Sequence, residues 1–234
     1  MQMTRQVGPE LLDQLPPDDP QALGSRRDLQ RINLLMGNAR ILSRTIQALA
    51  SAGAVRRVVE LGAGDGTFMW RLAAQLSARC QSVEVLLVDR QKTVAQETLD
   101  AFRRLGWNAV FVQSDVLAWL SVARRDEIDL IVANLFLHHF PEDALRTLLQ
   151  LAFARTKCFV ACEPRRCVTA LLASRLLGLI GCNGVTRHDA SVSVRAGFAG
   201  RELSNLCPGA AGWQLQERRA GLFSHCFAAQ RFIP

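Results

Sequence analysis

Cysteine pairs of the kind that hold zinc are missing from this sequence. None of the seven cysteines forms a C-x-x-C pair, and none lies near a spaced pair of histidines. Their odd number and irregular spacing are typical of small core residues in a reducing compartment. We therefore expect a cytoplasmic protein without a metal site.

Long apolar segments are also absent. The N-terminus lacks the apolar stretch of a signal peptide. The longest apolar stretch, residues 167–182, contains Arg175 and is shorter than the roughly 20 residues that cross a bilayer. The sequence therefore predicts no transmembrane segment.

Clustered charge is missing as well, although the net charge is +7. A basic protein invites a nucleic-acid interpretation. However, no run of five like charges occurs, and the arginines form scattered pairs, several of them at expected helix ends, where cations are locally favoured. The pattern favours an ordinary solvated surface, and nucleic-acid binding stays open as an alternative.

What is present is the composition of a folded domain. The chain is 49% hydrophobic and 21% charged, and its length fits one large domain. Residues 1–25 contain Leu-Pro-Pro-Asp-Asp-Pro and net acidity, which predicts a flexible or loosely docked tail. Residues 26–234 are expected to form a single domain. It begins with a cap over 26–54, where an apolar residue at every third or fourth position predicts one helix from Asp28 to Ala50, with Gly53 as its stop.

Strands and helices then alternate along the chain. Strands are predicted at 55–61, 83–89, 109–113, 128–134 and 158–162, and helices at 67–79, 93–105, 116–123 and 141–155. Residues 164–199 form a lid insertion with one apolar helix and a glycine-rich stretch, and strands at 213–219 and 223–232 form a terminal hairpin. The pattern predicts an α/β fold. Its sheet is doubly wound, Rossmann-like and seven-stranded, with a C-terminal antiparallel hairpin.

A glycine loop follows the first strand. Residues 58–67 read Val-Val-Glu-Leu-Gly-Ala-Gly-Asp-Gly-Thr, so a strand ends in a loop that opens a helix. Such a loop lets a ligand approach bare backbone at the carboxyl end of the sheet. Glu60 at the mouth of the loop would repel a pyrophosphate but suits a ligand that carries an ammonium and a sulfonium. The glycine spacing also departs from the dinucleotide fingerprint, which makes a nicotinamide-dependent oxidoreductase the least favoured enzyme.

The segment resembles motif I of class I S-adenosylmethionine (SAM)-dependent methyltransferases. By this resemblance the glycine loop binds the methionine and ribose portions of SAM. Asp89, at the end of the second strand, can accept hydrogen bonds from both ribose hydroxyls, and the following Arg90 lies near the adenine. The resemblance puts Asp115 at the adenine amino group and Val116 near the ring, although helix capping would also explain either aspartate.

The fourth strand ends in Asn134-Leu135, followed by Phe-Leu-His-His-Phe. This segment resembles motif IV of the small-molecule branch that includes the ubiquinone/menaquinone-type methyltransferases, and it implies that Asn134 and Leu135 line the methyl-transfer channel. The cofactor-binding residues that the resemblance implies are Glu60, Gly62, Ala63, Gly64, Gly66, Asp89, Arg90, Ser114, Asp115, Val116, Asn134 and Leu135.

The acceptor is indicated by absences and by the lid. The chain has no Asn/Asp-Pro-Pro-Tyr after the fourth strand, as base-amino methylases have, and no Pro-Cys or Thr-Cys nucleophile. The Leu- and Ile-rich insertion predicts a small hydrophobic or aromatic acceptor sealed from water. Dimer contact, membrane-surface association and simple core packing are the competing explanations of the same apolar residues.

A general base helps when the acceptor is a hydroxyl, and O-methylation is the favoured reaction. The first candidate is His188 within the lid, with Asp189 as its orienting partner and His139 as a weaker alternative. His188 and Asp189 could instead form a polar turn. Two other functions stay open: an RNA methyltransferase that uses the basic surface, and a SAM-binding module without catalysis.

Overall fold

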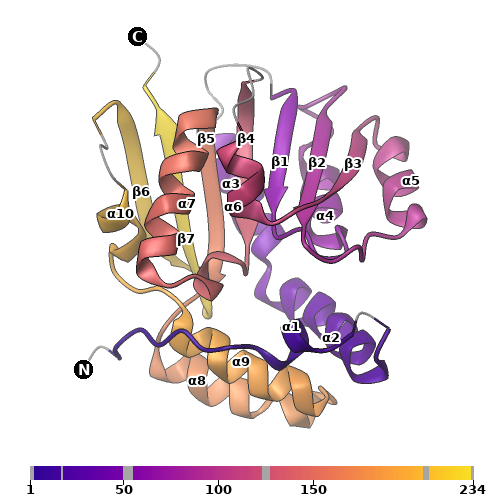
Figure 1. Ribbon diagram of the computed structural model, residues 1–234, viewed down its shortest axis with the longest axis vertical. Coiled ribbons are helices and arrows are strands. Elements are labelled where there is room, and N and C mark those ends of the chain that lie inside the picture. Colours follow the sequence, from indigo (N-terminus) through magenta and orange to yellow (C-terminus); the bar gives the residue numbers. More distant parts are fainter. Residues whose placement is uncertain (1–2, 17, 50–54, 123–126, 208–210, 233–234) are drawn as a thin grey trace.

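The computed structural model describes residues 3–16, 18–49, 55–122, 127–207 and 211–232 and shows one seven-stranded sheet (Figure 1). The strand order is β3-β2-β1-β4-β5-β7-β6. The strands are β1 (Arg57–Leu61), β2 (Glu84–Asp89), β3 (Asn108–Gln113), β4 (Ile128–Asn134), β5 (Thr156–Pro164), β6 (Trp213–Ala220) and β7 (Ser224–Arg231). All neighbours are parallel except β7, which is antiparallel to both β5 and β6. The predicted Rossmann-like sheet with its C-terminal hairpin is confirmed.

Helices cover both faces of the sheet, as the nearly all-apolar β4 requires. One face packs against α3 (Asn38–Leu49), α4 (Thr67–Leu76) and α5 (Gln96–Arg104). The other packs against α6 (Val116–Ser121), α7 (Glu142–Arg155) and α10 (Glu202–Leu206). The two buried clusters fix the sheet, and therefore fix the loops at the carboxyl ends of its strands.

A helical cap lies beyond those carboxyl ends (Figure 1). It consists of α1 (Leu11–Gln14), α2 (Pro20–Met36), α8 (Val168–Arg175), the 3-10 turn η2 (Leu177–Ile180) and α9 (Gly184–Ala196). A second 3-10 turn, η1 (Leu137–His139), follows β4 and contacts α9. None of the described helices is long and apolar enough to cross a bilayer.

The single helix predicted for 28–50 is two helices. α2 begins earlier, at Pro20, where Asp19 caps its first turn, and it ends at Gly37, whose φ of 67° is left-handed. The Gly37 N–H donates to the carbonyls of Asn33 and Leu34, and α3 starts directly afterwards. The apolar periodicity continues across the break, so it gave no sign of the interruption. Ala50 and Gly53 lie outside the described residues.

The N-terminal segment differs from the expected flexible or loosely docked tail. The guanidinium of Arg5 donates to the carbonyls of Ala196, His138 and Phe140 at 2.8–3.2 Å, and Glu10 is buried. The segment therefore contacts both α9 and η1, and Figure 1 shows its ribbon running across α9 toward α1. Charged residues made this segment look solvated, but their partners lie more than 120 residues away in the sequence.

The insertion also differs from expectation. Its glycine-rich, histidine-containing stretch is α9, which starts where Asn183 accepts a hydrogen bond from Thr186 N. The predicted apolar helix is α8, but its large side chains point outward. The exposed apolar side chains of α8 and η2 are Val168, Leu172, Leu176, Leu179 and Ile180. None of them lines the cavity described below, so the apolar lid predicted for the acceptor is wrong in this respect.

Candidate active site

A cavity of about 790 Å³ lies between the carboxyl ends of the strands and the cap. β1 and β4 are neighbours in the sheet, although β2 and β3 lie between them in sequence, so the strand order reverses at this point. Such a switch point is where open α/β sheets bind ligands. The loops after the first four strands contribute to one side of the cavity, and α1, α2 and η1 contribute to the other.

Glu60 lies at the floor of the cavity and is 2% exposed. Burial, together with the nearby carboxylates of Asp65 and Asp89, raises the pKa of Glu60 well above its usual range. Its Oε2 atom is buried and has no hydrogen-bond partner among the described residues. A buried acceptor of this kind is costly unless a ligand supplies a donor, and an ammonium would be the most favourable one.

The glycine loop is held open by Asp89. One oxygen of this carboxylate accepts from Gly64 N and the other from Gln91 N, both at 2.9 Å. Asp89 caps no helix, because α5 begins only at Gln96. Asp89 lines the cavity, and each of its oxygens can accept a further hydrogen bond. This position suits hydrogen bonds from a ribose, as the resemblance implied.

Gly62 is the most constrained residue of the loop. Its φ is 70°, and a Cβ atom there would stand 2.1 Å from the ring of Phe136. Gly64 shares the left-handed conformation, with a φ of 54°, but a Cβ atom there meets nothing within 4 Å. We therefore expect Gly62→Ala to destabilise the protein by about 1–3 kcal/mol more than Gly64→Ala does. Chemical denaturation of both variants measures this difference, and equal losses would show that the Phe136 ring moves aside at no cost.

Two of the three residues predicted in the loop after β3 reach the cavity. Asp115 and Val116 line the cavity, and Asp115 also caps α6 by accepting from Ala118 N at 3.1 Å. Ser114 does not line the cavity; its hydroxyl donates to the Asp115 carbonyl instead. Of the other predicted cofactor residues, Arg90, Ala63 and Leu135 line it, whereas Gly66 lies behind it as the N-cap of α4.

An amide network ties the end of β4 to the cap. Asn134 accepts from the side chain of Asn38 at 2.9 Å and donates to that of Asn33 at 3.1 Å. The next residue, Leu135, has a left-handed φ of 50°, which is unusual for a side chain of this size. Such strained residues persist where the surrounding contacts fix them, and here they turn the chain from β4 into η1.

α2 covers the cofactor side of the cavity through side-chain hydrogen bonds. Gln30 donates to Asp65 of the glycine loop, and Arg26 donates to Gln91 after β2 at 3.0 Å. Leu29 adds an apolar contact surface to the same wall. The sequence had predicted a cap here, but not that its polar side chains would meet the loops after β1 and β2.

His138 is fully enclosed between two carboxylates. Its Nδ1 lies 2.8 Å from Oε2 of Glu163, and its Nε2 lies 3.4 Å from Oε1 of Glu10. Burial alone would lower the pKa of His138, but the hydrogen bonds to Glu10 and Glu163 raise it to about 9. Burial would likewise raise the pKa of Glu10, but its bond to His138 is the main cause that lowers it to about 2. Sequence reasoning missed Glu10 because it lies in the segment interpreted as a tail.

His139 follows on the same turn and is 25% exposed in its side chain. Its Nδ1 lies 3.5 Å from Oδ2 of Asp13, and its Nε2 lies 4.0 Å from Oε2 of Glu10. All three of these residues line the cavity. A histidine beside an orienting carboxylate is thus present where an acceptor could lie, at a position that the sequence ranked below His188.

His188 does not line the cavity, and its side chain is 49% exposed. Its Nδ1 lies 2.8 Å from Oδ1 of Asp189. Asp189 is buried and accepts from the backbone N–H groups of Leu11 and Leu12, so it anchors the first turn of α1. The pair predicted as base and orienter therefore serves the docking of the N-terminal segment. The prediction differs from the structure because the direction in which a side chain of α9 points depends on the tertiary structure.

Residues 58–157 match the family model described as a methyltransferase domain. This stretch of the chain is similar to a methyltransferase domain. The match spans the four strand ends that build the cofactor side of the cavity, and the cofactor of this domain is S-adenosylmethionine. No curated protein matches the sequence at a significant level.

Solved structures share the fold at low identity. The magnesium protoporphyrin IX methyltransferase of Synechocystis PCC 6803, solved with bound SAM, is 11% identical with a TM-score of 0.54, over 95% of this chain and 88% of that chain. The mitomycin 7-O-methyltransferase MmcR is 15% identical with a TM-score of 0.62, over 94% of this chain and 60% of that chain. An O-methyltransferase family protein of Burkholderia thailandensis is 16% identical with a TM-score of 0.55, over 92% and 64%. The chain therefore spans less than two thirds of the last two proteins.

The residues present fit SAM. The unpartnered oxygen of Glu60 offers an acceptor for the ammonium of the methionine portion, and the glycine loop leaves backbone exposed beside it. Asp89 offers lone pairs to the ribose hydroxyls. These features match a cofactor that combines positive charge with a ribose, and the Glu60 carboxylate would repel a pyrophosphate.

Proposed function

We propose that this chain methylates a hydroxyl group of a small hydrophobic or aromatic acceptor. One observation carries the proposal: the cavity that begins at the glycine loop continues beneath the cap to a second side, lined by aromatic rings and by ionisable groups. Phe136 and Phe140 pack edge to face there, with ring centroids 5.1 Å apart, and Leu12 of α1 adds to the apolar wall. A compartment of this size and lining suits a small molecule.

SAM supplies a methyl group on a positively charged sulfur. Transfer forms the bond between acceptor oxygen and methyl carbon and breaks the carbon–sulfur bond, whose electron pair stays on sulfur, while the hydroxyl proton leaves. The chain's own residues bind and orient the reactants: Glu60 and Asp89 hold the cofactor, and Asn134 fixes the turn between the two sides. In this proposal the cap excludes water, which strengthens the electrostatic contacts to the cofactor and keeps the two reactants aligned.

The hydroxyl proton is removed, in this proposal, at the group formed by Glu10, His138 and His139. This revises the expected base from His188 to His139, because His139 lines the cavity and His188 does not. Asp13 lies against its Nδ1 and orients the ring. General-base assistance is worth roughly 10²–10⁴-fold in rate.

Two observations favour a small acceptor over RNA. The cations that line the cavity from the described residues are Arg26 and Arg90, alongside the two histidines, and both arginines flank Gln91 on the cofactor side. Residues of the N-terminal segment and of α2 also line the cavity, and no other arginine or lysine of the described residues does so. The resemblance to the ubiquinone/menaquinone-type branch is consistent with this assignment and is part of the proposal.

The proposal also places the reaction in the cytoplasm, which suits seven cysteines that are all unpaired. The exposed apolar side chains of α8 and η2 suit a homodimer contact, which sedimentation of the purified protein would test.

The decisive experiment is an acceptor screen with methyl-labelled SAM and product mass detection. Phenols, quinols and polyketide-like aromatics form one arm, and total RNA forms the other. We expect a mass gain of one methyl group on an aromatic hydroxyl, with kcat lowered about 10²–10⁴-fold by His139→Gln and unchanged by His188→Gln. Methylation confined to RNA, or SAM binding without turnover on any acceptor, would contradict the proposal. Equal turnover of His139→Gln and wild type would refute the assigned base.

A further inference from the structure

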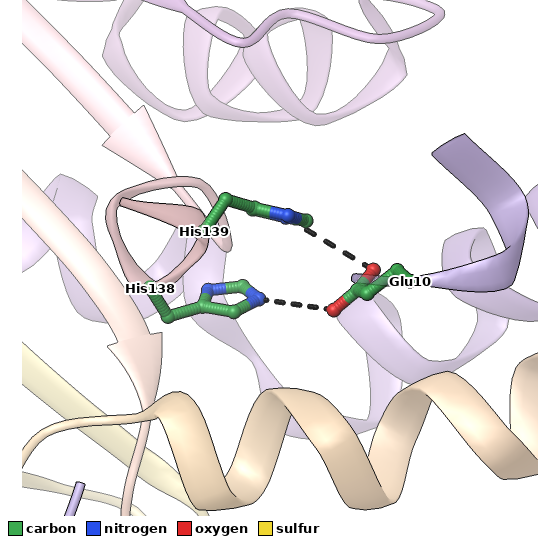
Figure 2. A group of neighbouring side chains, drawn as sticks. All are labelled: Glu10, His138 and His139. Carbon is green, nitrogen blue, oxygen red and sulfur yellow. Dashed lines mark hydrogen bonds and ion pairs between the residues drawn. The ribbon is translucent and has the colours of Figure 1, made fainter. Parts of the chain in front are cut away.

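The side chains of Glu10, His138 and His139 converge on one point beside the acceptor side of the cavity (Figure 2). One ligand atom from each residue lies within 4.8 Å of the other two. Figure 2 shows both imidazole rings pointing an edge at the carboxylate of Glu10, which lies in the N-terminal segment. Three potential metal-ligand atoms thus come from two segments that are far apart in sequence.

Each histidine presents Nε2 to Glu10 and Nδ1 to a second carboxylate. Glu163 lies 2.8 Å from Nδ1 of His138, and Asp13 lies 3.5 Å from Nδ1 of His139. A carboxylate on the far nitrogen fixes the tautomer and turns the lone pair of Nε2 toward the centre. This carboxylate–histidine arrangement is the usual support of histidines that bind a metal ion; it is a hydrogen bond at His138 and a longer contact at His139.

The distances agree with a metal centre. Ligand bonds of 2.0–2.2 Å in a tetrahedral site place neighbouring ligand atoms about 3.3–3.6 Å apart. The Nε2–Oε1 distance between His138 and Glu10 is 3.4 Å, and the Nε2–Oε2 distance between His139 and Glu10 is 4.0 Å. The second distance requires only a small rotation of the partly exposed His139 ring.

Charge supports the same conclusion. Three carboxylates surround two imidazoles, so neutral rings would leave an excess of negative charge. The Nε2 atoms of both rings face the Glu10 oxygens, an arrangement that either a proton on Nε2 or a positive ion between these atoms would stabilise. A metal ion would use all three converging ligand atoms at once, whereas a proton bridges only one of the pairs.

We propose that Glu10, His138 and His139 bind a divalent first-row transition metal ion, for which Zn²⁺ is the best fit. Two imidazoles and one carboxylate form a ligand set typical of catalytic zinc sites, which keep an open position for water or substrate. Because all three residues line the cavity, that position faces the acceptor side. Ser193, whose hydroxyl donates to Glu10, holds the carboxylate in place.

The use of such an ion rests on the proposed function. A divalent cation lowers the pKa of a hydroxyl that it binds, so it would help the acceptor to lose its proton at neutral pH. With the ion bound, His139 would therefore serve as a ligand rather than as the base. In this arrangement Glu163 and Asp13 are positioning residues, since each acts through a histidine. The metal site itself can be tested without any acceptor.

The experiment titrates the full chain, stripped with a chelator and then dialysed, with Zn²⁺ by calorimetry and with Co²⁺ by visible absorption. We expect one ion per chain in the wild type and in His188→Gln, which serves as a matched control because that histidine also faces a carboxylate but lies outside the cavity. His139→Gln should weaken binding at least 100-fold, and Glu163→Gln should weaken it about 10–100-fold. Circular dichroism confirms that each variant is folded.

The outcomes separate the two proposals. If the wild type binds no ion, or if His139→Gln and Glu10→Gln bind it as tightly as the wild type, the metal proposal is overturned, whereas SAM binding and acceptor turnover stay measurable. If one ion binds and is lost with His139, the site is established even when the loaded protein methylates no acceptor, and that result would count against the proposed function alone.

Discussion

Replacing Glu60 with glutamine is expected to weaken SAM binding on the order of 100-fold or more. A buried carboxylate that pairs with an ammonium typically contributes 2–5 kcal/mol to a complex, much of which is lost when one partner is neutralised. The effect is measured by calorimetric titration with SAM and with S-adenosylhomocysteine. Glu84→Gln is the matched control, because Glu84 begins β2 at the opposite edge of the sheet and is exposed.

The same substitution should stabilise the unliganded protein. Burial and the neighbouring Asp65 and Asp89 raise the pKa of Glu60 in the folded state, so the folded chain retains a proton that the unfolded chain releases. The contribution to stability is therefore fully present below the unfolded pKa of about 4.3 and is lost as the pH rises toward the raised folded pKa. Glutamine is neutral at every pH and escapes this loss.

Thermal unfolding at pH 5 and pH 8 tests the effect. Glu60→Gln should unfold roughly 2–10 °C above wild type at pH 8 and closer to it at pH 5. An equal or lower midpoint for the variant at pH 8 would mean that the Glu60 carboxylate is ionised and that its charge is stabilised in the protein even without ligand. In either case, retained SAM affinity would remove Glu60 from the cofactor site.

Glu163→Ala is the second change with a large expected effect. Oε1 of Glu163 accepts from the backbone N–H groups of Phe136 and Leu137, and Oε2 accepts from His138, both from its N–H at 3.3 Å and from its ring at 2.8 Å. Glu163 is 0% exposed, so alanine would leave these donors buried and unsatisfied. We expect a loss of about 3–5 kcal/mol in the free energy of unfolding.

Thermal unfolding measures this loss as a fall of roughly 6–20 °C in the midpoint. Glu163→Gln retains one acceptor oxygen and should fall between alanine and wild type. Glu142→Ala, which removes an exposed surface pair with Arg146, should change the midpoint by at most a few degrees. A midpoint for Glu163→Ala close to that of Glu142→Ala would show that water replaces Glu163 as the acceptor for the N–H groups of the turn after β4.

Local sequence patterns predicted the sheet well. β4 was predicted with the bounds that the structure has, because seven consecutive residues, nearly all apolar, fit a strand covered on both faces. The glycine loop and Asp89 were also placed correctly at the edge where the cavity lies. Each of these signals is contained within about ten residues, and parallel topology then brings successive strand ends together.

The cap was predicted less well, because its side chains face partners that no local pattern reveals. Asp189 and His188 are adjacent on α9, yet neither lines the cavity, and Val168 and Leu172 of α8 are exposed. The direction in which a helix faces depends on what packs against it. In this region the covering element is the N-terminal segment, whose polar composition resembled that of a tail.

The sequence by itself therefore determined the doubly wound sheet, the loop that suits SAM and the carboxylates at its strand ends. Only the tertiary structure decided which histidine meets the acceptor side. Glu10 reaches His138 across 128 positions of the sequence, and Glu163 reaches the same ring from the next strand of the sheet. Local periodicity carries no information about such contacts, since they form only after the core has fixed the strands and the cap has closed over them.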